Sequence, residues 1–141
     1  MNDTLDPGLD ELVGSWLTLP DVAEALGLDV GKVRRLVAER HLVGIKRGPR
    51  TTFQVPAAFL VPRETPRDAD DAGDDPDERP GHLDVLAAVR GTVLVLGDAG
   101  FSDREILRWM FQVDPSIGQA PIEALRAGRK AEVRRVAQSL A

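Results

Sequence analysis

Apolar residues recur at helical spacing in two short stretches near the start of the chain. The first stretch carries Val22, Ala25 and Leu26. The second follows the i, i+3, i+4, i+7 spacing of an amphipathic helix, with apolar residues at Val30, Val33, Leu36 and Val37. The pattern therefore predicts two consecutive short helices, each with one buried face.

Capping residues mark the ends of these two predicted helices. Thr18 and Asp21 have the spacing of a capping box, in which each side chain bonds the other residue's backbone N–H. Gly27 suits the left-handed position that ends a helix, and Asp29 suits the N-cap of the next one. The tight turn between the two helices predicts a helix-turn-helix.

Beyond the second helix the pattern changes to period two, which is typical of strands. Val43 and Ile45 alternate in one predicted strand, and Phe53 and Val55 alternate in a second. Residues 47–50, with a central Gly-Pro turn, join the two strands as a hairpin. The hairpin resembles the wing that follows some helix-turn-helix motifs.

The second half of the chain is predicted to be helical. Ser102 and Glu105 form a second capping box. The predicted helices are Leu83–Leu96, a helix from Ser102 to Phe111, a short helix from Pro121 to Leu125, and Ala131–Leu140. Trp109 and Phe111 serve the core in this interpretation, and a partner-binding stripe is the alternative.

These elements predict a mainly α fold with four segments. The chain has 141 residues, of which 43% are hydrophobic and 29% charged, values typical of globular proteins. The predicted segments are a flexible acidic tail (1–14), a winged helix-turn-helix domain (15–61), an acidic proline-rich linker (62–81) and a C-terminal helical domain (82–141). The linker is either a solvated spacer or an acidic shield for the basic module.

The distribution of charge favours nucleic acid although the net charge is −5. Residues 15–60 carry seven Lys or Arg and four Asp or Glu, a local charge of +3. On the second helix, Gly31, Arg35 and Ala38 lie opposite the buried Val33, and two small residues there permit close approach to a groove. The residues predicted to contact DNA are Lys32, Arg34, Arg35, Arg40, Lys46, Arg47 and Arg50.

These cations are assigned different tasks. Arg35 is the candidate for a bidentate contact with a base, flanked by Lys32 and Arg34. The hairpin cations hold phosphates, and Arg40 joins them from the end of the helix.

The residues of familiar catalytic and cofactor sites are missing from the sequence. There is no Cys, and the only histidines, His41 and His82, have no carboxylate cluster at metal-ligand spacing. The run GTVLVLGDAGF has Gly97 and Gly100 but lacks the Lys and Ser/Thr of a phosphate-binding loop. We therefore expect a protein with no cofactor, metal or enzymatic activity, without a signal peptide or membrane span, in the cytoplasm.

The segment LPDVAEALGLDVGKVRRLVAERHLVGIKRG resembles the winged helix-turn-helix of MerR and excisionase-like proteins. With GDAGFSDREILRWMFQVDPS, PIEALRAG and EVRRVAQSLA, the chain resembles an actinobacterial DNA-binding protein family that includes the mycobacterial substrate of the Ser/Thr protein kinase PknL. The resemblance implies a double-stranded DNA partner, a role in transcription regulation, and a kinase partner. It implies a phosphorylated Thr in the N-terminal tail, where Thr4 is the only one.

A protein–protein adaptor is the alternative function. The PIEALRAG segment also resembles the C-terminal domain of some antitoxins, whose helices bind a partner toxin. In that case the C-terminal helices would bind a protein partner, and the helix-turn-helix would serve only as a scaffold.

Overall fold

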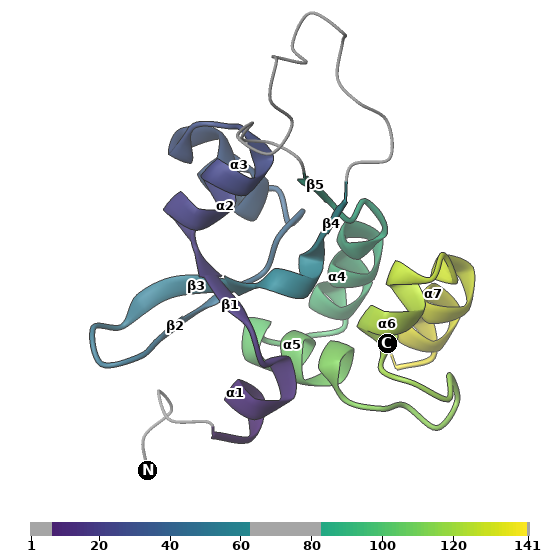
Figure 1. Ribbon diagram of the computed structural model, residues 1–141. Helices are drawn as coiled ribbons and strands as arrows, with labels where there is room; N and C mark the ends of the chain where they lie inside the picture. The colour runs from purple at the N-terminus through teal and green to yellow at the C-terminus, as the bar shows by residue number, and fades with distance from the viewer. Residues whose placement is uncertain (1–6, 63–82, 141) are drawn as a thin grey trace, which may run out of the picture.

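A computed structural model describes residues 7–62 and 83–140 of the chain. Its mainly helical fold with a small winged helix-turn-helix is the predicted one (Figure 1). In chain order the elements are α1 (Pro7–Val13), β1 (Trp16–Thr18), α2 (Leu19–Leu26), α3 (Val30–Ala38), β2 (Ile45–Arg47), β3 (Thr52–Pro56), the 3-10 helix η1 (Ala57–Phe59), β4 (Leu60–Pro62), β5 (Leu83–Val85), α4 (Ala88–Asp98), α5 (Asp103–Phe111), α6 (Pro121–Arg126) and α7 (Lys130–Ser139).

The helix-turn-helix is capped as predicted. The Asp21 N–H donates to Thr18 Oγ1 at 3.3 Å, and the Thr18 N–H donates to Asp21 Oδ2 at 3.2 Å. Gly27 ends α2 with φ 71°, in the left-handed region. Asp29 Oδ1 accepts the Lys32 N–H at 2.8 Å and starts α3. These local bonds set the short turn between α2 and α3.

The wing belongs to a three-stranded antiparallel sheet in the order β1-β3-β2. β2 and β3 form a hairpin as predicted, and it extends from the rest of the molecule (Figure 1). Its bounds differ from the prediction, since Val43 lies before β2 and Arg47 belongs to β2 and not to the turn. The strand β1 was not predicted, because three residues before a helix cap carry too short a pattern. It is held by pairing with β3 across the fold, with Trp16 opposite Pro56 and Thr18 opposite Gln54.

The helix predicted over Leu83–Leu96 begins later than expected, so this prediction is wrong at its start. Residues Leu83–Val85 form β5, which pairs antiparallel with β4, and the helix α4 starts at Ala88. The pairing partner of β5, β4, precedes it in the sequence by about twenty residues, so a local sequence pattern cannot reveal the pairing.

The acidic N-terminal segment also differs from the prediction of a flexible tail over 1–14. Pro7–Val13 is a helix that packs on α5, and Leu9 is completely buried. The many acidic residues of this segment are typical of a solvated tail, although Leu9 anchors it in the core. Residues 1–6, with Thr4, and the predicted linker residues 63–82 lie outside the described residues. The remaining segment boundaries stay a prediction.

One hydrophobic core runs through both halves of the described structure. Leu9, Val22, Val55 and Phe59 belong to the same cluster as the apolar faces of α4–α7. Phe59 and Phe111 meet with ring centroids 5.7 Å apart at an angle of 55°. Phe111 is only 8% exposed, which favours its interpretation as core over a partner-binding stripe. The N-terminal and C-terminal elements are therefore joined by packing as well as by the chain.

The predicted capping box at the start of α5 is present. Ser102 N–H donates to Glu105 Oε1 at 2.9 Å, and Glu105 N–H donates to Ser102 Oγ at 3.1 Å. The hydrogen bond from the Ser102 backbone, followed by one from its side chain, lowers the pKa of Glu105 below its ordinary value. These hydrogen bonds therefore favour the charged form of the carboxylate that caps α5.

Candidate nucleic-acid interface

The exposed face of α3 has the composition expected of a recognition helix. Val33 is completely buried, whereas Gly31, Arg35 and Ala38 on the opposite face are exposed. Lys32 and Arg34 are exposed beside them. The small residues leave the backbone of α3 accessible to a groove, and the three cations surround that accessible strip.

In the wing, the pleat of β2 separates two neighbouring cations. Lys46 pairs opposite Phe53, and Arg47 pairs opposite Thr52. Successive side chains point to opposite faces of a strand, so Lys46 shares a face with Phe53 while Arg47 points to the other face. Lys46 is exposed, as is Arg50 in the turn between the strands. These two cations are available to a ligand.

Arg47 is engaged within the protein. Its Nε donates to Asp10 Oδ1 at 3.1 Å and its Nη1 donates to Gln54 Oε1 at 3.0 Å. The guanidinium also lies 4.7 Å from the centroid of the Trp16 ring, within the range of a cation–π contact. Arg47 therefore joins α1 to the sheet, and we leave it out of the proposed DNA contacts.

Arg40 is also engaged, at the end of α3. It takes the left-handed conformation, with φ 68°, that ends many helices, and the His41 N–H closes the motif on the Leu36 carbonyl at 2.8 Å. Its Nη2 donates to Asp103 Oδ1 on α5 at 2.7 Å. This ion pair holds the end of α3 beside α5. Arg40, like Arg47, is therefore not among the proposed DNA contacts.

A second arginine holds the same end of α3, and no pattern in the sequence indicates it. Arg90 of α4 donates from Nε to the Glu39 carbonyl at 2.8 Å. A cation near the last carbonyls of a helix is favoured by the helix dipole. Arg90 and Asp103 were missed because both lie more than fifty residues from their partners. Together they fix the direction of α3.

Five of the seven predicted cations remain exposed, and across residues 7–62 and 83–140 none of them is hydrogen-bonded or ion-paired through its side chain. They are Lys32, Arg34, Arg35, Lys46 and Arg50. Two separate elements thus present basic groups, as a helix in a groove with a hairpin on phosphates requires.

The described residues show no other kind of functional site at this surface. In the described ranges no three His, Asp or Glu side chains gather in the way a metal site requires. His41 is half-buried, with Nε2 3.8 Å from a Glu39 carboxylate oxygen. None of the helices between residues 7 and 62 or between 83 and 140 combines the length and the apolar character needed to cross a membrane.

Two family models match this chain. Residues 1–60 match the model described as the winged helix-turn-helix domain of the DNA-binding protein Rv2175c. Residues 86–141 match the model described as the Rv2175c C-terminal domain of unknown function. The two matches follow in chain order and cover both halves of the molecule.

A whole-chain relative and a solved structure agree with these matches. The DNA-binding protein Rv2175c of Mycobacterium tuberculosis is 32% identical over 152 residues, which cover 99% of this chain and 86% of the relative. The NMR structure of Rv2175c superimposes with a TM-score of 0.67 at 29% identity, over 99% of this chain and 86% of that one. The likeness thus extends through both the winged helix-turn-helix and the C-terminal helices.

Proposed function

Because the chain belongs to the family of the winged helix-turn-helix DNA-binding protein Rv2175c, we propose that it binds double-stranded DNA with α3 in the major groove. In this proposal it is a cytoplasmic transcription regulator without catalytic activity. The observation that carries it is the pair of basic elements, α3 and the wing, whose exposed cations have no partner side chain among the described residues.

The two elements divide the work in this proposal. Arg35 stands on the outermost face of α3 between Gly31 and Ala38, where it reaches the edges of bases. A guanidinium matches the paired acceptors of guanine, which gives discrimination between bases. Lys46 and Arg50 of the wing contact phosphates, which gives affinity without discrimination.

Replacing Arg35 by alanine is expected to change sequence preference. Loss of a bidentate contact removes about 1–3 kcal/mol of discrimination at one base position, so the preferred and altered duplexes become nearly equal in affinity. Competition binding with a library of single-position variants of the best duplex measures this. Arg34→Ala is the matched control, since it removes a neighbouring charge from the side of the same helix.

Replacing Lys46 by alanine is expected to weaken binding to all duplexes alike. One lost phosphate contact flattens the plot of log affinity against log salt by about 0.9 of a slope unit. Titrations of two unrelated duplexes over a range of salt measure this slope. If Arg35→Ala and Lys46→Ala behave identically, the proposed division between helix and wing is wrong.

We further propose that a Ser/Thr kinase phosphorylates Thr4 and that this modification weakens DNA binding. Thr4 lies outside the described residues, with two residues between it and the start of α1 at Pro7. A phosphate adds about two negative charges to an acidic N-terminal segment, and this charge would repel the phosphates of DNA. Thr4→Asp is then expected to bind DNA several-fold more weakly than Thr4→Ala at low salt, with a smaller difference at physiological salt. Equal affinities of the two variants would contradict the proposal.

The adaptor alternative is tested best on the whole chain. The buried cluster joins Leu9, Val22 and Phe59 to the C-terminal helices, so a fragment of either half would expose core residues and bind proteins non-specifically. A full-length protein with alanine at Lys32, Arg34 and Arg35 separates the functions. An adaptor would keep its partner after this change, whereas a DNA-binding protein would lose its ligand.

A further inference from the structure

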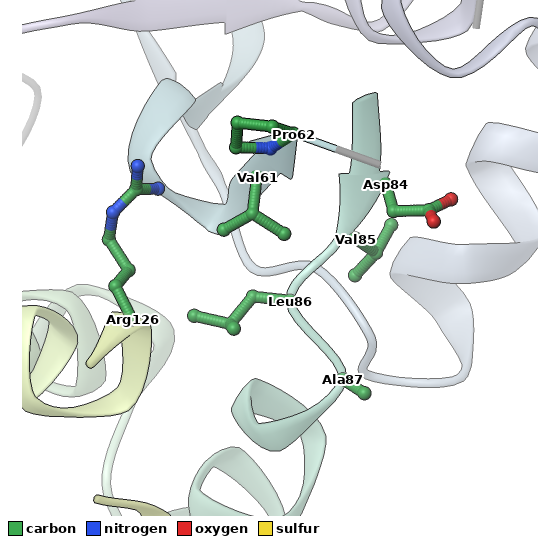
Figure 2. Close-up of a pocket in the computed structure, with 7 residues that line it drawn as sticks. All are labelled: Val61, Pro62, Asp84, Val85, Leu86, Ala87 and Arg126. Carbon is green, nitrogen blue, oxygen red and sulfur yellow. The ribbon is translucent and has the colours of Figure 1, made fainter. Parts of the chain in front are cut away.

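Two surface cavities of about 540 Å³ each lie outside the proposed interface. The first lies beside the β4–β5 pair (Figure 2). It is lined mainly by aliphatic side chains, and Arg126 at its edge donates to the carbonyls of Ala58 and Leu60 at 2.7 and 2.9 Å. That arginine is committed to the backbone, so the cavity offers little to a charged ligand.

The second cavity is a groove between α4 and α7, here called the α4–α7 groove. Four of its lining residues are basic, Arg90, Lys130, Arg134 and Arg135, and none is acidic. The others are small or neutral. The sequence from His82 to Ala141 is almost balanced in charge, and this balance conceals the concentration of positive charge on one surface. Such a surface raises the local concentration of polyanions.

The basic side chains of α7 are free to bind a ligand. Lys130 and Arg134 are one helical turn apart on the same face of α7. Within the described ranges, the side chains of these two residues and of Arg135 make no hydrogen bond or ion pair. The acid of this helix, Glu132, is occupied by Arg129. The charge of the groove is therefore not neutralised locally.

The α4–α7 groove also connects to the recognition helix. Arg90 lines the groove, and the same guanidinium donates to the Glu39 carbonyl at the end of α3. Across the groove, the Arg134 guanidinium lies over Gly91, where a built Cβ would be 3.1 Å from Nη2. The basic surface thus begins where α3 ends and continues over α4 to α7.

We propose that the α4–α7 groove binds the phosphate backbone of the same DNA duplex that α3 contacts, through Lys130, Arg134 and Arg135. The inference rests on the proposed function. It assigns a role to the C-terminal helices, which extend the footprint on DNA beyond the helix-turn-helix. Each phosphate contact strengthens binding at low salt by releasing counterions, independently of sequence.

The test is DNA binding by the full chain carrying Arg134→Gln and Arg135→Gln. Duplexes of about 25 base pairs are titrated by fluorescence anisotropy from low to physiological salt. The expected result is a salt slope reduced by roughly 1.8 and an affinity about fivefold lower per lost contact at 0.15 M salt. Arg108→Gln is the charge control. This exposed arginine belongs to α5, so it is part of neither α3 nor the wing, and it does not line the groove. Circular dichroism shows whether each variant keeps its fold.

The outcomes separate this inference from the proposed function. Parent-like binding by the double variant, equal to that of Arg108→Gln, would overturn the groove as a DNA site and leave the function of α3 and the wing intact. A parent protein that binds no duplex at low salt would overturn both. A second variant, Lys130→Gln, is expected to reduce the salt slope by about 0.9. An unchanged slope in a correctly folded Lys130→Gln protein would contradict the proposal.

Discussion

Replacing Phe59 by alanine is expected to lower the free energy of unfolding by about 4 kcal/mol. Truncation of a fully buried phenylalanine costs roughly 3–5 kcal/mol through lost burial and the cavity left behind. Phe59 is 0% exposed, and its ring meets that of Phe111 on α5. The residue also anchors the chain, since its carbonyl accepts the Leu86 N–H at 2.8 Å. Urea unfolding measures the loss, and Val113→Ala, at a 65% exposed position, is the control with a change within about 0.5 kcal/mol.

The same substitution tests whether the two halves unfold together. The two tryptophans report separately, since Trp16 lies in the winged helix-turn-helix and Trp109 lies on α5. The variants Trp16→Phe and Trp109→Phe leave one reporter each. Coincident transitions, both shifted by Phe59→Ala, are expected for a continuous core. Two separated transitions, with only one of them moved, would show that the halves are independent.

Replacing Gly44 by alanine is expected to destabilise the wing and cost about 3 kcal/mol of stability, the upper part of the usual range for overpacking. Gly44 is buried just before β2. A Cβ there would collide with the Gln54 carbonyl oxygen and lie 2.8 Å from both Phe53 Cζ and Val55 Cγ1. The carbonyl belongs to the backbone of β3, so relief requires the two strands to move apart.

The wing cations give this prediction a second measurement. Because Lys46 and Arg50 depend on the hairpin for their placement, Gly44→Ala is also expected to weaken DNA binding more than Lys46→Ala alone. Gly97→Ala is the control, since a Cβ on this residue of α4 meets nothing within 4 Å and alanine favours a helix by up to about 1 kcal/mol. A Gly44→Ala protein as stable as its parent would contradict the packing of the wing described above.

Local bonding explains which parts of the fold were predictable. Thr18 with Asp21, Asp29, and Ser102 with Glu105 bond within one helical turn, and all three caps were predicted from spacing alone. The strands β1, β4 and β5 were missed because each has three residues and a partner that lies far away in the sequence. A sequence pattern reveals only local periodicity, whereas the formation of such short strands depends on pairing with distant residues.

The candidate site shows the same distinction. Exposure on α3 followed from the apolar period, since the burial of Val33 fixes the outward direction of Arg35. The ion-pair partners of Arg40 and Arg47 could not be predicted in this way. Arg40 pairs with Asp103 of α5, and Arg47 pairs with Asp10 of α1. The sequence alone does not show whether a charged side chain faces solvent or forms an ion pair between two elements. The α4–α7 groove could not be predicted for a related reason, since the net charge of residues 82–141 does not show that four cations gather on one surface.

The most direct test of the account is an anisotropy titration of the intact protein with random and genomic duplexes from low to physiological salt. Saturable binding that favours some sequences and weakens with salt is the expected result. The two wing contacts, from Lys46 and Arg50, give a slope of roughly −2. Phosphate contacts by Lys32 and Arg34 beside Arg35 would bring it to roughly −4, and contacts in the α4–α7 groove make it steeper. The absence of binding at low salt, by a protein shown to be folded, would contradict it.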